Sequence, residues 1–510
     1  MTARPSDSLV HSSSGSLSKW LVFFFALAAI AFGVFAAWGS SEWLAFVGVV
    51  IVVLIAAWTL PESFLTPILI GLVAAQFYFP VPGASANLRG ALIFVAAVAL
   101  RIGLTRPLRR RAWMLPAALF LLVAFVAALG APDRYAAFKG IYEWGAVFLT
   151  AFVAGELIAS RAALTRAVIV LVAIGVVEAL VGLAQAALGV DRVIAILRAP
   201  LNEIFFQPNL LRERLTDLSF NWILYDRILP FGNFINAVDY AVFLAAILVL
   251  ALSFVIAGHD TAKQSSLSDV GIASRKPLAM TPRIILLVSI LAMGAALLLT
   301  FKGSGLLALA GGALMIALFF LNGTWRLPRL TPRTLVVGSV LALATLVFAA
   351  PFADLLVARA AFLIQRETGA VTSVGRLAVW AQLIPFLTQR PFFGFGLNNA
   401  IPLIEPIPTL IGGAFAYTTP APESSYVAML IETGLLGFSA LMSLFAVTLV
   451  QAWHNARKSK DAIHVGIIAA FVALLVGNLT VAGLTTDQNG MLFGLLLGIS
   501  SRNWRLAVGS

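Results

Sequence analysis

The residue best placed for chemistry is a glutamate at the threshold of an apolar run. In APESSYVAMLIETGLLG, residues 421–437, Glu423 comes shortly before a run long enough to cross a membrane. A carboxylate at this place can act as a general base, which takes a proton from a reacting hydroxyl group. It can also cap the helix that starts there, because a helix N-terminus favours an acidic group. We expect the catalytic role, with capping as the alternative.

Two cations occupy positions that suit a phosphate-containing ligand. Arg376 and Trp380 are four residues apart in TSVGRLAVWAQLIPFL, so they share one face if this stretch is a helix. The planar guanidinium group of arginine binds phosphate through two charge-assisted hydrogen bonds. Lys302 separates two apolar runs in LLTFKGSGLL. We predict that Arg376 and Lys302 bind phosphate; the alternatives are an arginine that reaches the membrane interface and a lysine in a turn.

Four further residues are candidates for lining a cavity beside this glutamate. Asn236 and Asp239 stand at the start of an apolar run in GNFINAVDYAVFL, where they either line an outer cavity or cap a helix. Ser424 and Trp380 are the other two.

Other polar features predict structure more than catalysis. Glu178 stands in the middle of an apolar run; we expect a protonated or hydrogen-bonded group that faces another helix, with a functional group as the alternative. Glu432 follows Glu423 by nine residues, and a helix turns about 100° per residue, so the two carboxylates face opposite ways and form no paired site if both residues are helical. GFGLNN at 394–399 lacks the third glycine and preceding strand of a dinucleotide site, and predicts a tight turn, with or without a ligand beside it.

The histidine and cysteine content excludes several kinds of site. The chain has no cysteine, which rules out disulfides, thiolate metal ligands and a cysteine nucleophile. It has four histidines. One is in the N-terminal tail and the others fall on the predicted cytoplasmic side: His11, His259, His454 and His464. We therefore expect no metal and no cofactor at an outer site.

The elements that must position these residues are membrane helices. Of 510 residues 61% are hydrophobic and only 11% charged, which is far from the composition of soluble domains. We predict an all-α polytopic membrane protein of about 12–14 transmembrane helices, with a large, partly helical periplasmic loop near 353–424. The predicted spans are 20–38, 43–60, 64–80, 88–100, 113–130, 140–158, 167–188, 237–257, 284–301, 304–321, 334–352, 425–450, 464–482 and 489–502.

The basic residues fix the predicted orientation, because Lys and Arg collect in cytoplasmic loops. With the N-terminus inside, every basic cluster between spans falls on the cytoplasmic side, and both termini are cytoplasmic. The predicted organisation is a cytoplasmic tail (1–19), N-terminal transmembrane helices (20–188), a periplasmic loop (189–236), central transmembrane helices (237–352), a large periplasmic catalytic loop (353–424), and C-terminal transmembrane helices with a cytoplasmic tail (425–510). The formal net charge of +12 is explained by these loops and by lipid headgroups, so we expect no nucleic acid partner.

Three stretches resemble the bacterial O-antigen ligase and polysaccharide polymerase superfamily. SVGRLAVWAQLIPFLTQRPFFGFGLNN resembles the family's Arg-x-x-x-Trp segment, which is followed by a Pro and a Gly-x-Gly turn. ESSYVAMLIETGLLG resembles the segment that opens the helix after the large periplasmic loop, with its Glu-x-Gly-Leu-Leu-Gly ending. LLTFKGSGLLAL resembles an upstream segment with Thr and Ser-Arg-Gly. The resemblance covers roughly residues 230–500.

The resemblance implies a metal-independent glycosyltransferase of the bacterial inner membrane that needs no cofactor. Its donor would be an undecaprenyl-pyrophosphate-linked glycan and its acceptor another glycan. Membrane lipids and other polysaccharide-assembly proteins are further expected partners. The departing pyrophosphate would be stabilised by Arg376 and Lys302, and the acceptor hydroxyl would give its proton to Glu423.

Two departures from the family pattern favour a polymerase of exopolysaccharide or O-antigen. Ligases of this family typically have His-Asn where this chain has Glu423 and Ser424, and Lys302 is the nearest cationic counterpart of the family's Ser-Arg. The alternatives are an O-antigen ligase acting on lipid A-core and a lipid-linked glycan flippase or transporter. Glu178 would suit a transporter, whereas the long outer loop and the lack of an internal repeat count against one.

Overall fold

The computed structural model describes fourteen stretches of the chain, and everything below concerns these residues. They are 42–74, 78–80, 87–107, 109–198, 223–224, 227–234, 236–264, 281–322, 357, 376–405, 407–411, 414–418, 422–459 and 461–502.

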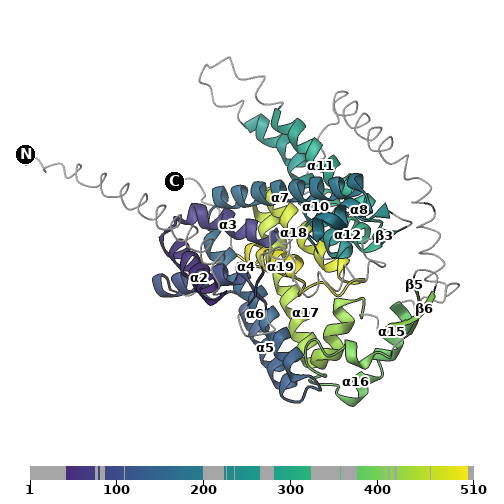
Figure 1. Cartoon of the computed structure of the whole chain (residues 1–510). Coiled ribbons are helices and arrows are strands. Elements are labelled where there is room, and N and C mark those ends of the chain that lie inside the picture. The colour runs from purple at the N-terminus through teal and green to yellow at the C-terminus, as the bar shows by residue number, and fades with distance from the viewer. Residues whose placement is uncertain are drawn as a thin grey trace, which may run out of the picture.

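Helices make up most of the described chain (Figure 1), as the apolar pattern predicts. In chain order they begin with α2 (Glu42–Thr59), α3 (Glu62–Ala74), α4 (Gly90–Thr105), α5 (Met114–Leu129), α6 (Arg134–Leu157), α7 (Arg161–Leu188) and α8 (Val190–Leu197). They continue with α10 (Ala237–Gln264), α11 (Thr281–Leu299), α12 (Gly303–Leu321), α15 (Arg376–Leu383), α16 (Phe386–Gln389), α17 (Ser425–Ser459), α18 (Ala462–Gly477) and α19 (Asp487–Ser500).

The described helices confirm the predicted fold class. Each predicted span overlaps a described helix except 20–38 and 334–352, which lie outside the described residues. The span predicted at 64–80 is too long, because α3 ends at Ala74 and residues 78–80 form a strand. Among the described helices, four have the length and apolar composition to cross a membrane: α7, α10, α12 and α17. The described strands form short antiparallel hairpins: β1 (Tyr78–Pro80) with β2 (Asn87–Arg89), β3 (Ile223–Leu224) with β4 (Arg227–Ile228), and β5 (Ile407–Ile411) with β6 (Ala414–Thr418). The chain is an all-α polytopic membrane protein.

The core lies around α10, whose side chains from Tyr240 to Ala251 are almost all buried by the surrounding helices. Beside it, Phe471 of α18 stacks on Phe493 of α19 with ring centroids 5.4 Å apart. Large apolar side chains on the outward faces stay exposed, among them Leu122 of α5 and Ile169 of α7. Such faces suit contact with lipid, since lipid tails are as apolar as these side chains.

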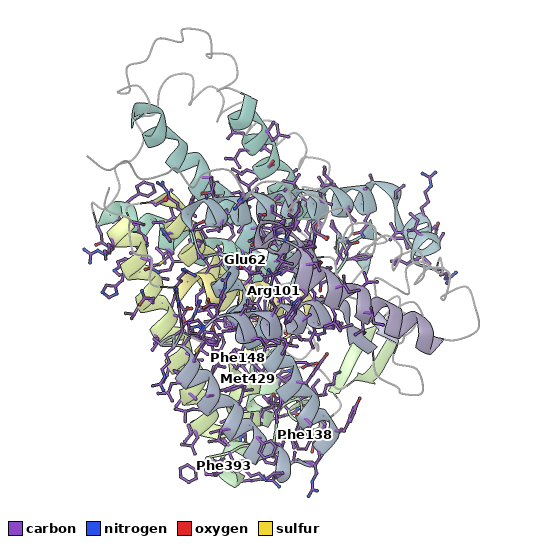
Figure 2. All side chains as sticks on the ribbon, turned by 90° about the vertical axis from the view of Figure 1, so that its left-hand side faces the viewer. Glu62, Arg101, Phe138, Phe148, Phe393 and Met429 are labelled. Atoms are coloured by element: carbon purple, nitrogen blue, oxygen red, sulfur yellow. The ribbon has the colours of Figure 1, made fainter. Side chains whose placement is uncertain are left out.

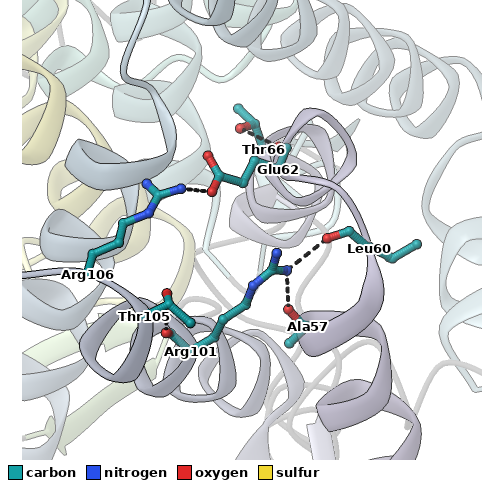
Figure 3. A network of polar contacts seen from close by, with 7 residues as sticks. All are labelled: Ala57, Leu60, Glu62, Thr66, Arg101, Thr105 and Arg106. Carbon is teal, nitrogen blue, oxygen red and sulfur yellow. Dashed lines mark hydrogen bonds and ion pairs between the residues drawn. The ribbon is translucent and has the colours of Figure 1, made fainter. Parts of the chain in front are cut away.

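The two ends of the helical bundle differ in their chemistry. At the arginine end, which we define by Arg101, Arg106, Arg111 and Arg161, guanidinium groups tie neighbouring helices together. Figure 3 shows Arg101 donating to the carbonyl oxygens of Ala57 and Leu60, at 2.8 Å each, and Arg106 paired with Glu62. The opposite end of the bundle, where the segments 189–236 and 353–424 join the helices, is called the loop end here. Figure 1 shows that α15, α16, β5 and β6 gather together.

Helix α17 departs from the predicted continuous span at 425–450. Gly434 has φ 61° and ψ −170°, which is not a helical conformation, so the helix breaks there. The rings of Tyr426 and Phe445 have centroids 6.3 Å apart, although nineteen residues of straight helix would extend about 28 Å. The half-helix 425–433 therefore folds back along the second half, 435–459. The apolar run concealed this break because both halves are apolar.

Candidate functional site

Glu423 stands at the foot of the half-helix, at the loop end. It is half-buried and has φ 49°, a left-handed conformation that is uncommon outside glycine. The residue before it is held by α15: the indole Nε1 of Trp380 donates to the carbonyl oxygen of Pro422 at 2.9 Å. Arg376 begins the same helix, one turn before Trp380. The helix expected to carry the Arg-x-x-x-Trp pair is therefore present, and it lies against the chain beside Glu423.

Ser424, and not Glu423, occupies the N-cap position of α17. Ser424 is buried, its carbonyl oxygen accepts from Ala428 N–H at 3.0 Å, and its Oγ lies 3.5 Å from Val427 N. This is the position from which a serine side chain satisfies the open N–H groups of a first turn. The capping alternative for Glu423 is weakened, and the predicted cavity-lining role of Ser424 remains a prediction.

The start of α17 is fastened to the connection between α18 and α19. The hydroxyl of Ser425 lies 2.9 Å from Asn478 Oδ1 and 3.0 Å from the carbonyl oxygen of Val481, and it accepts from Leu484 N–H at 3.2 Å. Asn478 Oδ1 also accepts from Gly483 N–H at 3.0 Å. The foot of the half-helix is thus anchored on both sides, by α15 and by residues 478–484.

The same connection reaches Asp239 at the start of α10. Asp239 is buried, and Asn489 Nδ2 donates to its carbonyl oxygen at 3.1 Å and lies 3.4 Å from its Oδ1. A β-carbon added at Gly483 would be only 2.6 Å from Asp239 Oδ1, so the two residues are in close contact. Asp239 therefore belongs to one layer of polar groups, which we call the polar layer, together with Ser425, Asn478, Gly483 and Asn489.

Asn236 caps a helix, which is one of the two roles, capping or cavity lining, that the sequence left open. Its Oδ1 accepts from Val238 N–H at 2.8 Å, and its carbonyl oxygen accepts from Tyr240 N–H at 3.1 Å. These bonds cap the first turn of α10.

Lys302 stands at the start of α12, on the same end of the bundle. It is half-buried and its backbone N–H donates to Thr300 Oγ1 at 3.3 Å. Three residues later, Gly305 packs on α10, where an added β-carbon would lie 2.7 Å from that of Ala241. Because Asp239 is two residues before Ala241, Lys302 and Asp239 are at the same end of neighbouring helices.

Several helices start at this end with their N–H groups directed toward it: α10, α12, α17 and α19. A helix N-terminus carries partial positive charge and open N–H donors, which favour a bound anion. The starts of these helices, together with Lys302, therefore favour a bound anion at the loop end.

Glu178 is hydrogen-bonded, as expected. It is buried in α7, where its Oε2 accepts from Asn233 N–H and its Oε1 from Asn233 Nδ2, both at 3.0 Å. The carbonyl oxygen of Asn233 in turn accepts from Gln488 Nε2 at 3.1 Å. Glu178 therefore fixes Asn233, in the chain that leads into α10. Asn233 in turn bonds to Gln488 of α19, which links Glu178 to the polar layer.

The sequence analysis did not single out the amides that join these parts: Asn233, Asn478, Gln488 and Asn489. Their one signal is a short interruption of the last apolar runs by polar residues, GNLT and TTDQN. Within the described part of the chain, no three His, Cys, Asp or Glu side chains stand close enough together to hold a metal ion.

Comparison with known proteins gives a family match over part of the chain. Residues 288–442 match the family model described as O-antigen ligase. The matched stretch contains Lys302, Arg376, Trp380 and Glu423, and also the break at Gly434. A search of curated proteins found no match to the chain. This match supports the resemblance of residues 288–442, with their Arg-x-x-x-Trp helix and Glu-x-Gly-Leu-Leu-Gly segment, to the O-antigen ligase and polysaccharide polymerase superfamily.

Proposed function

We propose that this protein is a membrane glycosyltransferase that polymerises undecaprenyl-pyrophosphate-linked oligosaccharide, or transfers it, at the periplasmic face. The observation that carries the proposal is the hydrogen bond from Trp380 to the carbonyl oxygen of Pro422. It sets the helix that begins with Arg376 beside the chain at Glu423, which supports a site built from separate parts of the matched domain. The proposed site opens at the loop end, where both substrates would enter from the membrane surface.

The proposed reaction moves a glycan from a lipid carrier to an acceptor sugar. The bond between the anomeric carbon of the donor and the pyrophosphate oxygen breaks, and undecaprenyl pyrophosphate leaves with the electron pair. A new bond forms between the anomeric carbon and the acceptor hydroxyl oxygen, with inversion. The hydroxyl proton passes to the carboxylate of Glu423. In an oxocarbenium-like transition state deprotonation can lag behind bond breaking, so a carboxylate is a sufficient base.

The leaving group gains negative charge as the bond breaks, and the proposal gives its stabilisation to Arg376 and Lys302. Cations and helix N-termini that are fixed before the reaction stabilise such charge without reorganisation. Lys302 begins α12, so it can act together with the first N–H groups of that helix. Trp380, Ser424 and Asp239 are proposed to line the cavity around the two sugars, whereas Asn236 caps the start of α10 beside it.

A polymerase is favoured because Glu423 and Ser424 stand where ligases of this family have His-Asn. The test is to delete the gene and separate the lipid-linked intermediates that accumulate. Single repeat units on undecaprenyl pyrophosphate support a polymerase. Finished polymer on the same carrier would instead identify a ligase, which is the activity that the matched family's description names.

A further inference from the structure

The Gly-x-Gly turn at 391–396 and the break in α17 interlock through their backbones. In a continuous helix the N–H groups of Leu435 and Leu436 would bond to the carbonyl oxygens of Ile431 and Glu432, four residues earlier. Here the turn inserts between them and bonds to all four groups. The bonds run from Phe395 N to Ile431 O (3.1 Å), Gly396 N to Glu432 O (2.8 Å), Leu435 N to Pro391 O (2.8 Å) and Leu436 N to Phe392 O (3.2 Å).

The interlock requires a glycine on each side. Gly394 has φ 71°, and a β-carbon there would lie 2.5 Å from the carbonyl oxygen of Ile431. Gly434 has φ 61°, and a β-carbon there would lie 2.5 Å from the carbonyl group of Phe392. Both backbones approach too closely for a side chain, and both conformations are ones that only glycine adopts without strain.

Glu432 adds a side-chain bond to this backbone contact. It is buried, and its Oε1 accepts from Ala400 N–H at 3.2 Å, four residues beyond the turn. Its Oε2 is also buried and has no hydrogen-bond partner within the described part of the chain. A carboxyl group in such a place holds the end of the turn against α17, and a catalytic role would need contact with solvent or substrate.

The interlock also contacts α15. Phe395, which donates one of the interlock bonds, packs in a small apolar cluster with Val379 and Leu383 of α15 and Ile431 of the half-helix. This cluster is separate from the main core of the bundle. We call α15, α16, residues 390–404 and the half-helix 425–433 the loop module. The placement of Trp380 over Pro422 depends on how this module sits.

A second contact braces the loop module on the turn between α5 and α6. Asn399 Nδ2 donates to the carbonyl oxygen of Asp133 at 3.0 Å, and Asp133 N–H donates to Asn399 Oδ1 at 2.9 Å. Arg390 Nη1 donates to the carbonyl oxygen of Gly130 at 2.6 Å. Figure 2 shows Phe393 and Phe138 at the same end of the molecule, well away from Glu62 and Arg101.

We propose that Glu432 is a positioning residue for the glycosyl transfer, acting through the Gly-x-Gly turn. By holding Ala400 and the interlocked turn, it fixes α15 so that Trp380 stays bonded to Pro422, the residue before Glu423. The inference rests on the proposed function for its catalytic consequence, but the position of α15 can be measured without activity.

The position of α15 can be measured by thiol labelling. The chain has no cysteine, so a single introduced cysteine is the only residue that a maleimide labels at a thiol. Val379→Cys places a thiol in the buried cluster of the loop module, and Thr388→Cys places one on the exposed surface of α16. Both are labelled with a membrane-impermeant maleimide in purified protein. Cys at 379 should be protected in the otherwise unchanged chain, whereas Cys at 388 should react at once.

The decisive pair of variants is Glu432→Ala and Glu432→Gln. Alanine removes the acceptor for Ala400 N–H, so labelling at 379 should speed up about tenfold and transfer should fall about 10- to 100-fold. Glutamine keeps an acceptor oxygen, so labelling and transfer should both stay near those of the unchanged chain. If Glu432→Gln is as inactive as Glu432→Ala, the carboxylate itself is needed and the positioning role is wrong.

A second variant covers the case in which Glu432→Ala does not accumulate as folded protein. Asn399→Ala removes the brace to Asp133 without touching α17, and it should also increase labelling at 379 and lower transfer. If Asn399→Ala speeds up labelling at position 379 but leaves transfer unchanged, the inference is wrong. It is also wrong if transfer is lost while the thiol at position 379 stays protected. If Glu423→Gln retains full transfer, the proposed role of Glu423 as base fails, and if the unchanged chain transfers no glycan, the proposed function fails. In both cases the labelling results still report whether Glu432 holds α15.

Discussion

The two ends of the bundle are held together by different forces. At the arginine end, ion pairs join residues far apart in the sequence: Arg111 with Glu156, Arg106 with Glu62, and Arg161 with Asp461. At the loop end, backbone groups and amide side chains do most of the joining, in the interlock at Gly434, the Asn399–Asp133 pair and the Ser425–Asn478 contact. The ion pairs described there, both with Glu143, are longer, at 3.9 Å each.

This difference agrees with the proposed function, in which the site of transfer lies at the loop end. Ion pairs fasten helix ends together without requiring one geometry of the backbone. Interlocked backbone bonds allow one arrangement only, and a site for bond making needs its groups fixed to a fraction of an ångström. The comparison predicts that damage at the arginine end lowers stability, while damage at the loop end lowers transfer first.

The largest loss of stability is expected from Glu156→Gln. Its ion pair with Arg111 is almost completely buried, with side chains 8% and 7% exposed. Removing one charge leaves the other buried without its partner, which costs about 3–5 kcal/mol of unfolding free energy. Thermal unfolding in detergent measures the loss, and transfer per folded molecule should be unchanged.

The double variant Arg111→Met with Glu156→Leu sharpens that result. Replacing a buried ion pair by apolar side chains is often neutral, so the double variant should recover most of the stability that Glu156→Gln loses. A double variant no more stable than the single one would show that this arginine is needed for its bond to the carbonyl oxygen of Gly498.

A smaller loss of stability but a larger loss of transfer is expected from Gly434→Ala. The left-handed conformation alone costs an alanine about 1–3 kcal/mol, and the β-carbon also forces the Gly-x-Gly turn away. Gly145→Ala is the matched control, because a β-carbon at Gly145 in α6 meets nothing within 4 Å. Equal transfer by the two variants would show that the interlock does not set the site.

The smallest effect is expected from Arg161→Ala at the arginine end. The Arg161 side chain is 72% exposed, although its Nε lies 2.9 Å from Asp461 Oδ2. Exposed ion pairs contribute about 0–1 kcal/mol and are screened by salt. Thermal unfolding at low and high salt should differ little between this variant and the unchanged chain; a loss as large as that of Glu156→Gln would contradict the distinction between buried and exposed pairs.

The fold was largely predictable from the sequence because apolar run length is set by membrane thickness. Most predicted runs overlap described helices. The loops in which arginines were predicted to collect on one side lie at the arginine end. The break at Gly434 was not predictable in this way, since IETGLLG is an apolar run with one glycine, and isolated glycines are tolerated within helices. What breaks the helix is the turn at 391–396, about forty residues earlier in the chain.

The candidate site was predictable only in part. Arg376 and Trp380 fall on one helix as their spacing predicts, and Trp380 reaches the residue before Glu423. Asn236 caps a helix, and Glu178 is hydrogen-bonded. The expected helical relation between Glu423 and Glu432 does not hold, because Glu423 precedes the helix in a left-handed conformation. Contacts such as Asn489 with Asp239 depend on which helices neighbour one another, which spacing along the chain does not contain.

The most direct test of the account is the rate of transfer by Glu423→Gln. The purified protein in lipid vesicles is given undecaprenyl-pyrophosphate-linked repeat units, and released undecaprenyl pyrophosphate is measured over time. Glu405→Gln, an exposed carboxylate on the same loop, is the matched control. The account predicts that Glu423→Gln is slower by about 10²- to 10⁴-fold while Glu405→Gln keeps the rate of the unchanged chain. A Glu423→Gln variant with that same rate would contradict it.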